Sequence, residues 1–299
     1  MDLGGADAKE RDMADTPFDA PCALCGGAWL RHRRDWIRRC ADCGALRADL
    51  PVTIGAGSAI DEGLREAGLD SLRRVNNDRL LDTLAGLSGP APTLLDVGCG
   101  PGFLLRDAAE KGFAPSGVEP DADVVAAARA QGAPVRNGFF PDALGADERF
   151  DIIVFNDVLE HIADIPAALA ASAAHLKAGG LLCVNCPDRR GLIYRVADLA
   201  DRFSFSGALK RLWQVGLPSP HLWYLTPQAL ERAAAPAGLR RIAAVRMESV
   251  VLKGLWRRIR YVKGQSLALS LAAYAFALST LPLARLLPAD SSATIFRRP

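Results

Sequence analysis

Two short, nearly continuous hydrophobic runs, Thr93–Val97 and Phe150–Phe155, mark the middle of the chain. Runs of this length between turn-forming residues predict strands that are covered on both faces, as in a parallel sheet. Helical spacing follows each run, over Phe103–Lys111 and over Ile165–Leu176. We therefore expect the middle of the chain to alternate between buried strands and helices.

Further strand patterns extend this alternation on both sides of the two runs. A chain that alternates strand, helix and strand calls for a parallel, doubly wound sheet. We predict an α/β fold with a Rossmann-like, seven-stranded, mostly parallel sheet. The additional strands are expected at Gly117–Glu119, Pro134–Arg136, Leu181–Asn185, Leu239–Met247 and Ala293–Arg297.

Residues 52–92, ahead of the first run, have the spacing of linker helices. Leu72, Leu80 and Leu84 fall near one face of a helix. Asp70 or Ser71 is the expected cap at the start of this helix. The segment is expected to lie over the nucleotide-binding part of the chain and not to form a domain of its own.

The composition is that of an ordinary globular protein. Of the 299 residues, 50% are hydrophobic and 23% are charged, which allows one large core or two smaller ones. The 36 lysine and arginine residues nearly balance the 34 aspartate and glutamate residues, and a formal net charge of +2 argues against a dedicated nucleic-acid binder. Residues 1–17 are polar and rich in small side chains, and we expect them to be a disordered lead-in.

Four cysteines form two Cys-x-x-Cys pairs, Cys22 with Cys25 and Cys40 with Cys43. Two such pairs supply four thiolates for a tetrahedral zinc ion, and four cysteine ligands leave no open position. We therefore predict a structural zinc ion in a module that spans residues 18–51. The paired cysteines, together with the lack of a signal-peptide pattern, predict a reducing, cytoplasmic location.

The segment between the cysteine pairs is rich in arginine and contains Trp29 and Trp36. One interpretation is a basic, aromatic surface that grips RNA or an anionic substrate. The other is an arginine-coated hairpin whose tryptophans pack inward. We favour the second interpretation.

A glycine-rich loop links the first hydrophobic run to the helix after it. Gly98, Gly100 and Gly102 alternate along this loop, where glycine permits a tight turn and leaves the backbone open to a ligand. A dinucleotide-binding loop has glycine at the position that Phe103 occupies here. Asp96, just before the loop, instead suits a ligand that carries an ammonium group.

The stretch Leu94–Gly102 closely resembles the first motif of class I S-adenosylmethionine (SAM)-dependent methyltransferases. The resemblance implies a SAM-binding domain, which we place at residues 93–250 and 290–299. Glu119, at the end of the second strand, is expected to accept hydrogen bonds from both ribose hydroxyls. The expected cofactor-binding residues are Asp96, Gly98, Cys99, Gly100, Gly102, Phe103, Glu119, Pro120, Gly138, Phe139, Asn156 and Asp157.

Two histidines are candidates for a catalytic general base. His161 follows the fourth strand, and His221 lies in a histidine–aromatic–Thr-Pro element that resembles a segment near the active-site mouth of small-molecule methyltransferases. A base is needed only where the acceptor proton is not already acidic. Thr226 and Pro227 are expected to begin a helix directly after this element.

An apolar helical insertion, residues 251–289, precedes the last strand. Residues 256–263 are basic and aromatic, and residues 264–284 carry no charge. A single membrane crossing would leave the last strand on the wrong side. We therefore expect residues 255–287 to lie peripherally in the inner face of the membrane, with the basic residues at the headgroups. A lid over the active site or a dimer interface is the alternative.

The resemblance implies an enzyme that transfers the SAM methyl group to a small or lipid-linked acceptor, at oxygen or carbon. The cysteine module is similar to amino-terminal modules of bacterial sugar and polysaccharide-pathway methyltransferases, which suggests a glycan-pathway acceptor. The alternatives are an RNA methyltransferase that uses the basic module, and a non-catalytic binding protein with a SAM fold. The fourth strand lacks the Asn/Asp-Pro-Pro-aromatic run typical of enzymes that methylate base amino groups.

Overall fold

The computed structural model describes Phe18, residues 20–53, 62–260 and 266–284, Leu286, and residues 288–299. The lead-in expected over residues 1–17 lies outside the described residues. So do Tyr261 and Lys263 of the basic, aromatic segment in the insertion.

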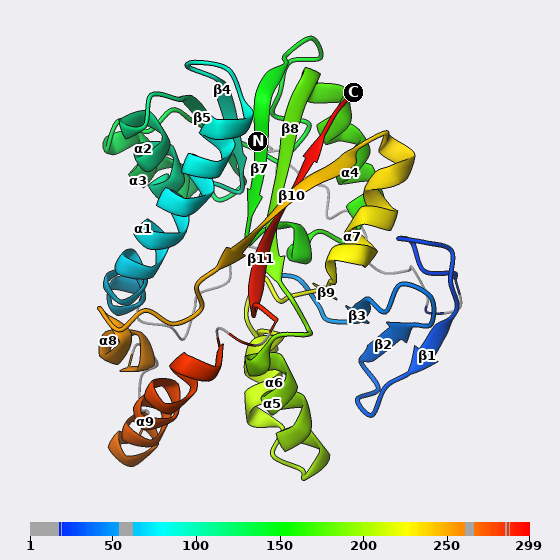
Figure 1. The fold of residues 1–299 in the computed structure, drawn as a ribbon, viewed down its shortest axis with the longest axis vertical. Coiled ribbons are helices and arrows are strands. Elements are labelled where there is room, and N and C mark those ends of the chain that lie inside the picture. Colours follow the sequence, from blue (N-terminus) through cyan, green and yellow to red (C-terminus); the bar gives the residue numbers. More distant parts are fainter. Residues whose placement is uncertain (1–17, 19, 54–61, 261–265, 285, 287) are drawn as a thin grey trace, which may run out of the picture.

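A seven-stranded sheet forms the centre of the molecule, in the order β10-β11-β8-β7-β4-β5-β6 (Figure 1). Neighbouring strands from β8 to β6 pair in parallel, whereas β11 runs antiparallel to both β8 and β10. The predicted Rossmann-like, mostly parallel sheet is confirmed. Its strands are β4 (Thr93–Val97), β5 (Ala114–Glu119), β6 (Val135–Asn137), β7 (Phe150–Asn156), β8 (Leu176–Pro187), β10 (Arg240–Met247) and β11 (Ser291–Arg297).

Successive side chains of the central strands pack on opposite faces of the sheet. On β4, Leu94 and Leu95 are both fully buried, but they belong to separate hydrophobic clusters. This two-sided burial explains why the strands read as nearly continuous hydrophobic runs. One face is covered by α4 (Ile165–His175) and α7 (Pro227–Ala234), and the other by α1 (Glu62–Leu87) and α2 (Phe103–Glu110).

Two helices begin at side-chain caps, and the start expected at Thr226 is confirmed. The Asp121 carboxylate accepts from the backbone N–H groups of Asp123 and Val124, at 3.0 and 3.2 Å, and begins α3 (Ala122–Ala130). The Thr226 hydroxyl accepts from the N–H of Ala229 at 3.1 Å at the start of α7. Each cap satisfies N–H groups that have no partner inside the helix.

Two local expectations were wrong. Helix α1 begins at Glu62, so Asp70 and Ser71 lie inside it and do not cap it, because the residues before them continue the helix. Strand β8 begins at Leu176, five residues before the expected start at Leu181, and takes in residues 177–180. Backbone hydrogen bonds between Arg298 and residues 179 and 180, at 3.0 and 2.9 Å, hold this stretch against the end of the chain.

The cysteine module joins the domain of the seven-stranded sheet through a second sheet, in the order β1-β2-β3-β9. Strand β3 pairs antiparallel with β9, Leu46 opposite Tyr224 and Arg47 opposite Trp223. Because β9 lies in the histidine–aromatic element, the module contacts that element directly. The strands are β1 (Trp29–Arg31), β2 (Ile37–Cys40), β3 (Leu46–Ala48) and β9 (Trp223–Tyr224).

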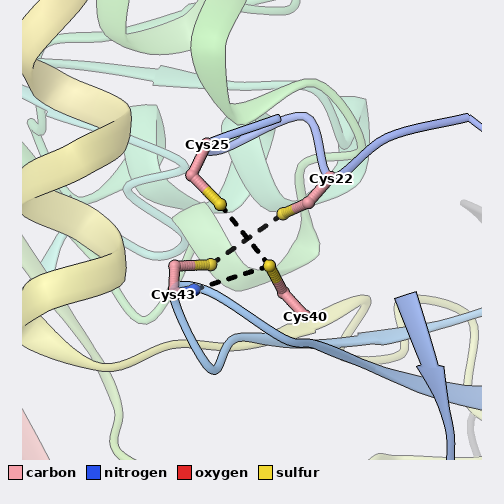
Figure 2. A group of neighbouring side chains, drawn as sticks. All are labelled: Cys22, Cys25, Cys40 and Cys43. Atoms are coloured by element: carbon pink, nitrogen blue, oxygen red, sulfur yellow. Dashed lines mark hydrogen bonds between the residues drawn. The ribbon is translucent and has the colours of Figure 1, made fainter. Parts of the chain in front are cut away.

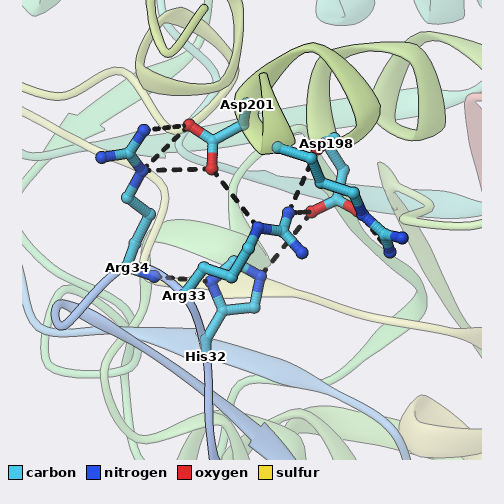
Figure 3. A network of polar contacts seen from close by, with 6 residues as sticks. His32, Arg33, Arg34, Asp198 and Asp201 are labelled. Carbon is cyan, nitrogen blue, oxygen red and sulfur yellow. Dashed lines mark hydrogen bonds and ion pairs between the residues drawn. The ribbon is translucent and has the colours of Figure 1, made fainter. Parts of the chain in front are cut away.

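Arginines of the module also form ion pairs with α5 (Leu192–Arg202), as Figure 3 shows. Arg33 Nη2 lies 2.6 Å from Asp198 Oδ1, and Arg34 Nε donates to Asp201 Oδ1 at 2.9 Å. The Asp201 side chain is 1% exposed, whereas that of Arg34 is 31% exposed, so only the carboxylate of this pair is removed from solvent. These two arginines therefore help to fix the module against the larger domain.

The module's tryptophans pack inward, as in the favoured interpretation of this segment. The ring of Trp29 lies 6.2 Å from that of Trp223, and the ring of Trp36 lies 5.7 Å from that of Trp213.

The remaining described helices are α6 (Gly207–Leu212), α8 (Leu255–Arg260), α9 (Leu267–Ala284) and the short 3₁₀ helices η1 (Leu159–His161) and η2 (Ala235–Ala237).

Candidate functional site

The glycine loop joins β4 to α2 at the carboxyl edge of the sheet. Gly98, Gly100 and Gly102 have φ angles of 67°, 52° and 85°, in the left-handed region that favours glycine. A Cβ atom at Gly98 would also lie 2.8 Å from the Val158 side chain. The N–H groups of Gly98 and Cys99 both donate to the Val118 carbonyl, at 2.8 and 3.2 Å, and tie the loop to β5. The backbone at the start of α2 is thereby held open for a ligand.

Glu119 connects the loop to the end of β5. Its Oε2 accepts from the Gly100 N–H at 3.0 Å, and its Oε1 accepts from the Asp121 N–H at 3.1 Å. Each carboxylate oxygen has more than one acceptor site, so both oxygens can still accept from a ligand hydroxyl. This geometry suits the predicted role of Glu119 as the acceptor for two ribose hydroxyls.

Asp96 lies beneath the same loop and is 3% exposed. Burial, and to a lesser extent the charge of Glu119, raise the pKa of its carboxyl group to about 8. A positively charged ligand group nearby would favour the ionised form and lower this pKa. The ammonium group of SAM is such a group, and the placement of Asp96 therefore fits the prediction.

The third part of the expected cofactor site lies at the end of β6. The Gly138 N–H donates to the Glu119 carbonyl at 3.0 Å, and Asn137 Nδ2 donates to the Pro120 carbonyl at the same distance. Phe139 is 57% exposed, which leaves an open aromatic ring beside the cofactor loops. Such a ring is available for stacking on a base.

Asn156 and Asp157 stand at the end of β7. Asp157 has a φ of 58°, which is strained for a residue other than glycine. Asn185 holds this turn in place: its Nδ2 donates to Asn156 Oδ1 at 2.8 Å and to Asp157 Oδ1 at 3.2 Å. The Asn185 carbonyl also accepts from the Asp157 N–H at 3.0 Å.

The expected cofactor residues thus lie at neighbouring strand ends, but the side chains of Cys99 and Phe103 contact other residues of the protein. The Cys99 side chain is buried in a small hydrophobic cluster with Leu105 and Val125, so only its backbone borders the loop. The guanidinium groups of Arg73 and Arg106 lie 4.7 and 5.7 Å from the Phe103 ring. These placements favour backbone or packing roles for Cys99 and Phe103.

The two predicted catalytic histidines lie side by side. Their ring centroids are 4.7 Å apart, although the residues are far apart in the sequence. His161 ends η1, and His221 precedes β9 and is 8% exposed. Burial, and then the neighbouring His161, lower the pKa of His221 to about 3, so its ring is neutral near pH 7.

Glu160, between β7 and His161, was missed by the sequence reasoning. Its side chain is 1% exposed, and within the described structure neither carboxylate oxygen has a hydrogen-bond partner. Burial raises the pKa of this carboxyl group well above its usual range, and the charge of Asp157 adds to the shift.

Asn185 was also missed as a site residue. Its position at the end of the fifth strand was the available signal.

The four paired cysteines converge as predicted (Figure 2). Cys22 Sγ lies 3.9 Å from Cys43 Sγ, and Cys25 Sγ lies 3.4 Å from Cys40 Sγ. All four are free thiols. A tetrahedral zinc ion with Zn–S bonds of about 2.3 Å holds its sulfurs roughly 3.8 Å apart. The donor set and its spacing therefore fit zinc.

Residues 69–244 match the family model of the methyltransferase domain, and this match covers more than half of the chain. The chain belongs to this family. The resemblance to class I SAM-dependent methyltransferases is thereby confirmed.

Proteins named ubiquinone biosynthesis O-methyltransferase are among its relatives. The protein from Rhodopseudomonas palustris (strain BisA53) is 30% identical over 164 residues, which cover 52% of this chain and 59% of the relative. The protein from Nitrobacter winogradskyi is 33% identical over 171 residues, which cover 54% of this chain and 60% of the relative. The chain thus spans less than two thirds of the length of these relatives.

Solved structures share the fold. One is in the complex between the Haloferax volcanii Trm112 methyltransferase activator and the putative methyltransferase. Its TM-score is 0.55 at 15% identity, and the match covers 80% of this chain and 95% of that chain. Another is the Haemonchus contortus phospholethanolamine N-methyltransferase 2 with S-adenosylhomocysteine. Its TM-score is 0.53 at 16% identity, and the match covers 80% of this chain and 57% of that chain. At these identities the likeness shows the fold alone.

We predict that Glu119→Ala weakens SAM binding about 10- to 100-fold, because it removes two hydrogen bonds that contribute roughly 0.5–1.5 kcal/mol each. Isothermal titration calorimetry with SAM measures this change. Glu110→Ala is the matched control, since its side chain is 58% exposed at the end of α2. Equal SAM affinities in the two folded variants would remove Glu119 from the cofactor site.

Proposed function

We propose that this chain transfers the methyl group of SAM to a hydroxyl oxygen of a small or lipid-linked acceptor. The observation that carries the proposal is the direct link between the glycine loop and Glu119, with the His161–His221 pair at the adjacent strand end. The names of the O-methyltransferase relatives support oxygen as the methylated atom.

Bound SAM supplies an electrophilic methyl group, and the protein's task is to align the acceptor oxygen with it. Asp96, Glu119 and the glycine loop would hold the cofactor. His161 and His221 are the candidates for a group that accepts the proton of the acceptor hydroxyl. His221 is the weaker base of the two, because its pKa is lowered to about 3.

A basic cavity supports an acceptor that carries an anionic group. It has a volume of about 440 Å³, lies just after β8, and is lined by Arg189, Arg190, Tyr194, Arg195, Asp198 and Pro288. Arg190 is paired with Asp188 at 2.7 Å. Arg189 is half-buried, and burial and the nearby Arg39 lower its pKa. A phosphate of a lipid-linked glycan is one group that such arginines bind well.

Incubation of the purified protein with methyl-labelled SAM and separate lipid, polar-metabolite and RNA fractions tests the proposal. Label is expected in an acid-stable ether of the lipid or polar fraction, and the Glu119→Ala variant should transfer far less. Label in RNA would establish the RNA alternative instead. SAM binding without transfer to any fraction would favour the non-catalytic alternative.

Zinc in the cysteine module is part of the proposal. Gly26 and Gly44, with φ angles of 74° and 70°, form the turn after each cysteine pair and bring the thiolates together. We predict about one equivalent of zinc in protein purified without added metal, as measured by elemental analysis. Cys43→Ser should lose the zinc, whereas Cys183→Ser, at a buried cysteine of β8, should keep it. A metal-free wild-type protein with four alkylatable thiols would contradict this.

The insertion exposes an apolar helix, α9. Leu267, Leu269, Leu271 and Phe276 are between 50% and 61% exposed, far more than is usual for such large apolar side chains. Trp256 of α8 packs on Tyr274 with ring centroids 5.8 Å apart, and Arg257 and Arg260 of α8 are exposed. Within the described part of the chain, no helix is both long and apolar enough to span a membrane. These features support peripheral attachment to an anionic membrane surface.

We predict that the full-length protein floats with anionic phospholipid vesicles in a density gradient. Leu267→Gln, Leu269→Gln and Leu271→Gln together should abolish flotation, because each buried leucine contributes about 1.5–3 kcal/mol. The matched control replaces the exposed Ala268, Ala272 and Ala275 by Gln, which adds the same polarity but removes less apolar surface. High salt should weaken the binding only in part. A tight dimer that stays at the bottom of the gradient would make the insertion an interface.

A further inference from the structure

Arg189, in the wall of the basic cavity, is a half-buried cation that no carboxylate of the described structure neutralises. It forms no ion pair there, and its buried Nε has no hydrogen-bond partner. Burial, and then the neighbouring Arg39, lower the pKa of its guanidinium group. Folded proteins rarely leave a buried donor unsatisfied. An anion bound in the cavity would satisfy this donor and offset the repulsion between the two arginines.

The cysteine module holds Arg189 at the cavity wall. A Cβ atom at Gly44 would lie 2.9 Å from Arg189 Nη2, so the guanidinium group occupies space that a side chain would otherwise fill. Gly44 ends the second cysteine turn with a φ of 70°, which also favours glycine. The module therefore positions this arginine while leaving its Nε without a protein partner.

The acid in the cavity wall is already neutralised. Among the described residues of the wall, Asp198 is the one carboxylate. It lies 2.6 Å from Arg33 of the module and 3.7 Å from Arg202 of its own helix (Figure 3). Its charge is therefore not available to balance the arginines of the cavity.

Two further arginines bring unused donors to the cavity. Arg190 donates to Asp188 Oδ2 through Nε and Nη2, at 3.0 and 2.7 Å, which leaves Nη1 for a ligand. Arg195 is exposed and forms no ion pair with the described residues. A guanidinium group can donate two parallel hydrogen bonds to a phosphoryl group. Three guanidinium groups in one wall can therefore bind two linked phosphoryl groups.

Aromatic rings connect the cavity wall to the candidate catalytic histidines. Tyr194 of the wall packs on Tyr224, with ring centroids 4.5 Å apart. Tyr224 in turn packs on His221, with ring centroids 5.6 Å apart. The ring of Tyr224 thus links the wall to His221, and a ligand held in the cavity lies close to the acceptor side of the site.

A second hollow, of about 400 Å³, adjoins the cavity. Arg190 and Pro288 line both, and Ala289 lines the second. Because Pro288 and Ala289 are the last residues before β11 rises from the apolar insertion, this hollow lies at the end of the insertion. It leaves room for a group attached to the far side of an anion in the cavity.

We propose that the cavity binds a diphosphate group of the acceptor, with Arg189, Arg190 and Arg195 as its ligands. The acceptor is then a diphosphate ester, and the hydroxyl that receives the methyl group lies on an esterified group. The diphosphate anchors the acceptor and takes no part in bond making. The role in the acceptor rests on the proposed function, whereas binding of diphosphate is measured by itself.

Isothermal titration calorimetry of the full-length protein with inorganic pyrophosphate tests the site. We expect about one saturable equivalent, bound at least ~10-fold more tightly than inorganic phosphate or dihexanoylphosphatidylglycerol, which carry one phosphorus atom each. Arg189→Gln and Arg195→Gln should each weaken pyrophosphate binding about 10-fold or more. Arg232→Gln, at an exposed arginine of α7, is the matched control and should bind as the wild type does.

Competition against pyrophosphate identifies the source of the diphosphate. Displacement by geranyl diphosphate supports a lipid diphosphate, and displacement by uridine diphosphate glucose supports a nucleotide sugar. Displacement by neither overturns the diphosphate ester as the acceptor class.

The variants decide the site itself. Absent pyrophosphate binding, binding no tighter than that of phosphate, or equal binding by Arg195→Gln and Arg232→Gln overturns the inference even if methyl transfer occurs. If Arg189→Gln does not fold, the exposed position of Arg195 keeps the comparison valid. Pyrophosphate binding that needs Arg195, without methyl transfer to any fraction, supports the diphosphate site while the proposed function fails.

Discussion

The parallel register of β4 with its two neighbours is the constraint on which the candidate site depends. Asp96 lies opposite Gly117 of β5 and Val154 of β7, so the three strands end at one edge. The glycine loop, Glu119 and Asp157 follow those ends and must therefore meet there. Hydrogen bonds from Gly100 and Asp121 to Glu119 then join loops that the strands have already brought together. A register shift on either side of β4 would separate them.

The cysteine module acts on the other half of the site. Strand β3 of the module pairs with β9, and the Leu222 N–H donates to the Glu160 carbonyl at 2.8 Å. His221 is thus held between the module and η1. Ion pairs from Arg33 and Arg34 to α5 hold the module from a second side. This arrangement connects the module of four cysteines to the position of a candidate catalytic histidine.

The parts of the molecule that sequence predicted well are those specified by neighbouring residues. Strand β4, its glycine loop and the cap at Thr226 depend on local turn chemistry and on hydrophobic runs. The β3–β9 pairing depends on residues that only the folded chain brings together, so no local pattern indicates it. The early start of β8 likewise depends on Arg298 at the far end of the chain. Glu160 has no local sign of its burial, because a glutamate after a strand is usually solvated.

One edge of the sheet therefore holds buried acids on both sides of the expected methyl-transfer position. The pKa of Asp96 is raised to about 8 in the folded chain. The unfolded carboxyl, with a pKa of about 3.9, has already lost its proton at neutral pH. Stability therefore falls as the pH rises from about 4 to about 8, unless a cation lowers the folded pKa. Glu160 is likewise buried and unpartnered within the described chain. A cationic ligand at this edge, such as a sulfonium nucleoside with its ammonium group, would favour the ionised form of Asp96 and lower its folded pKa.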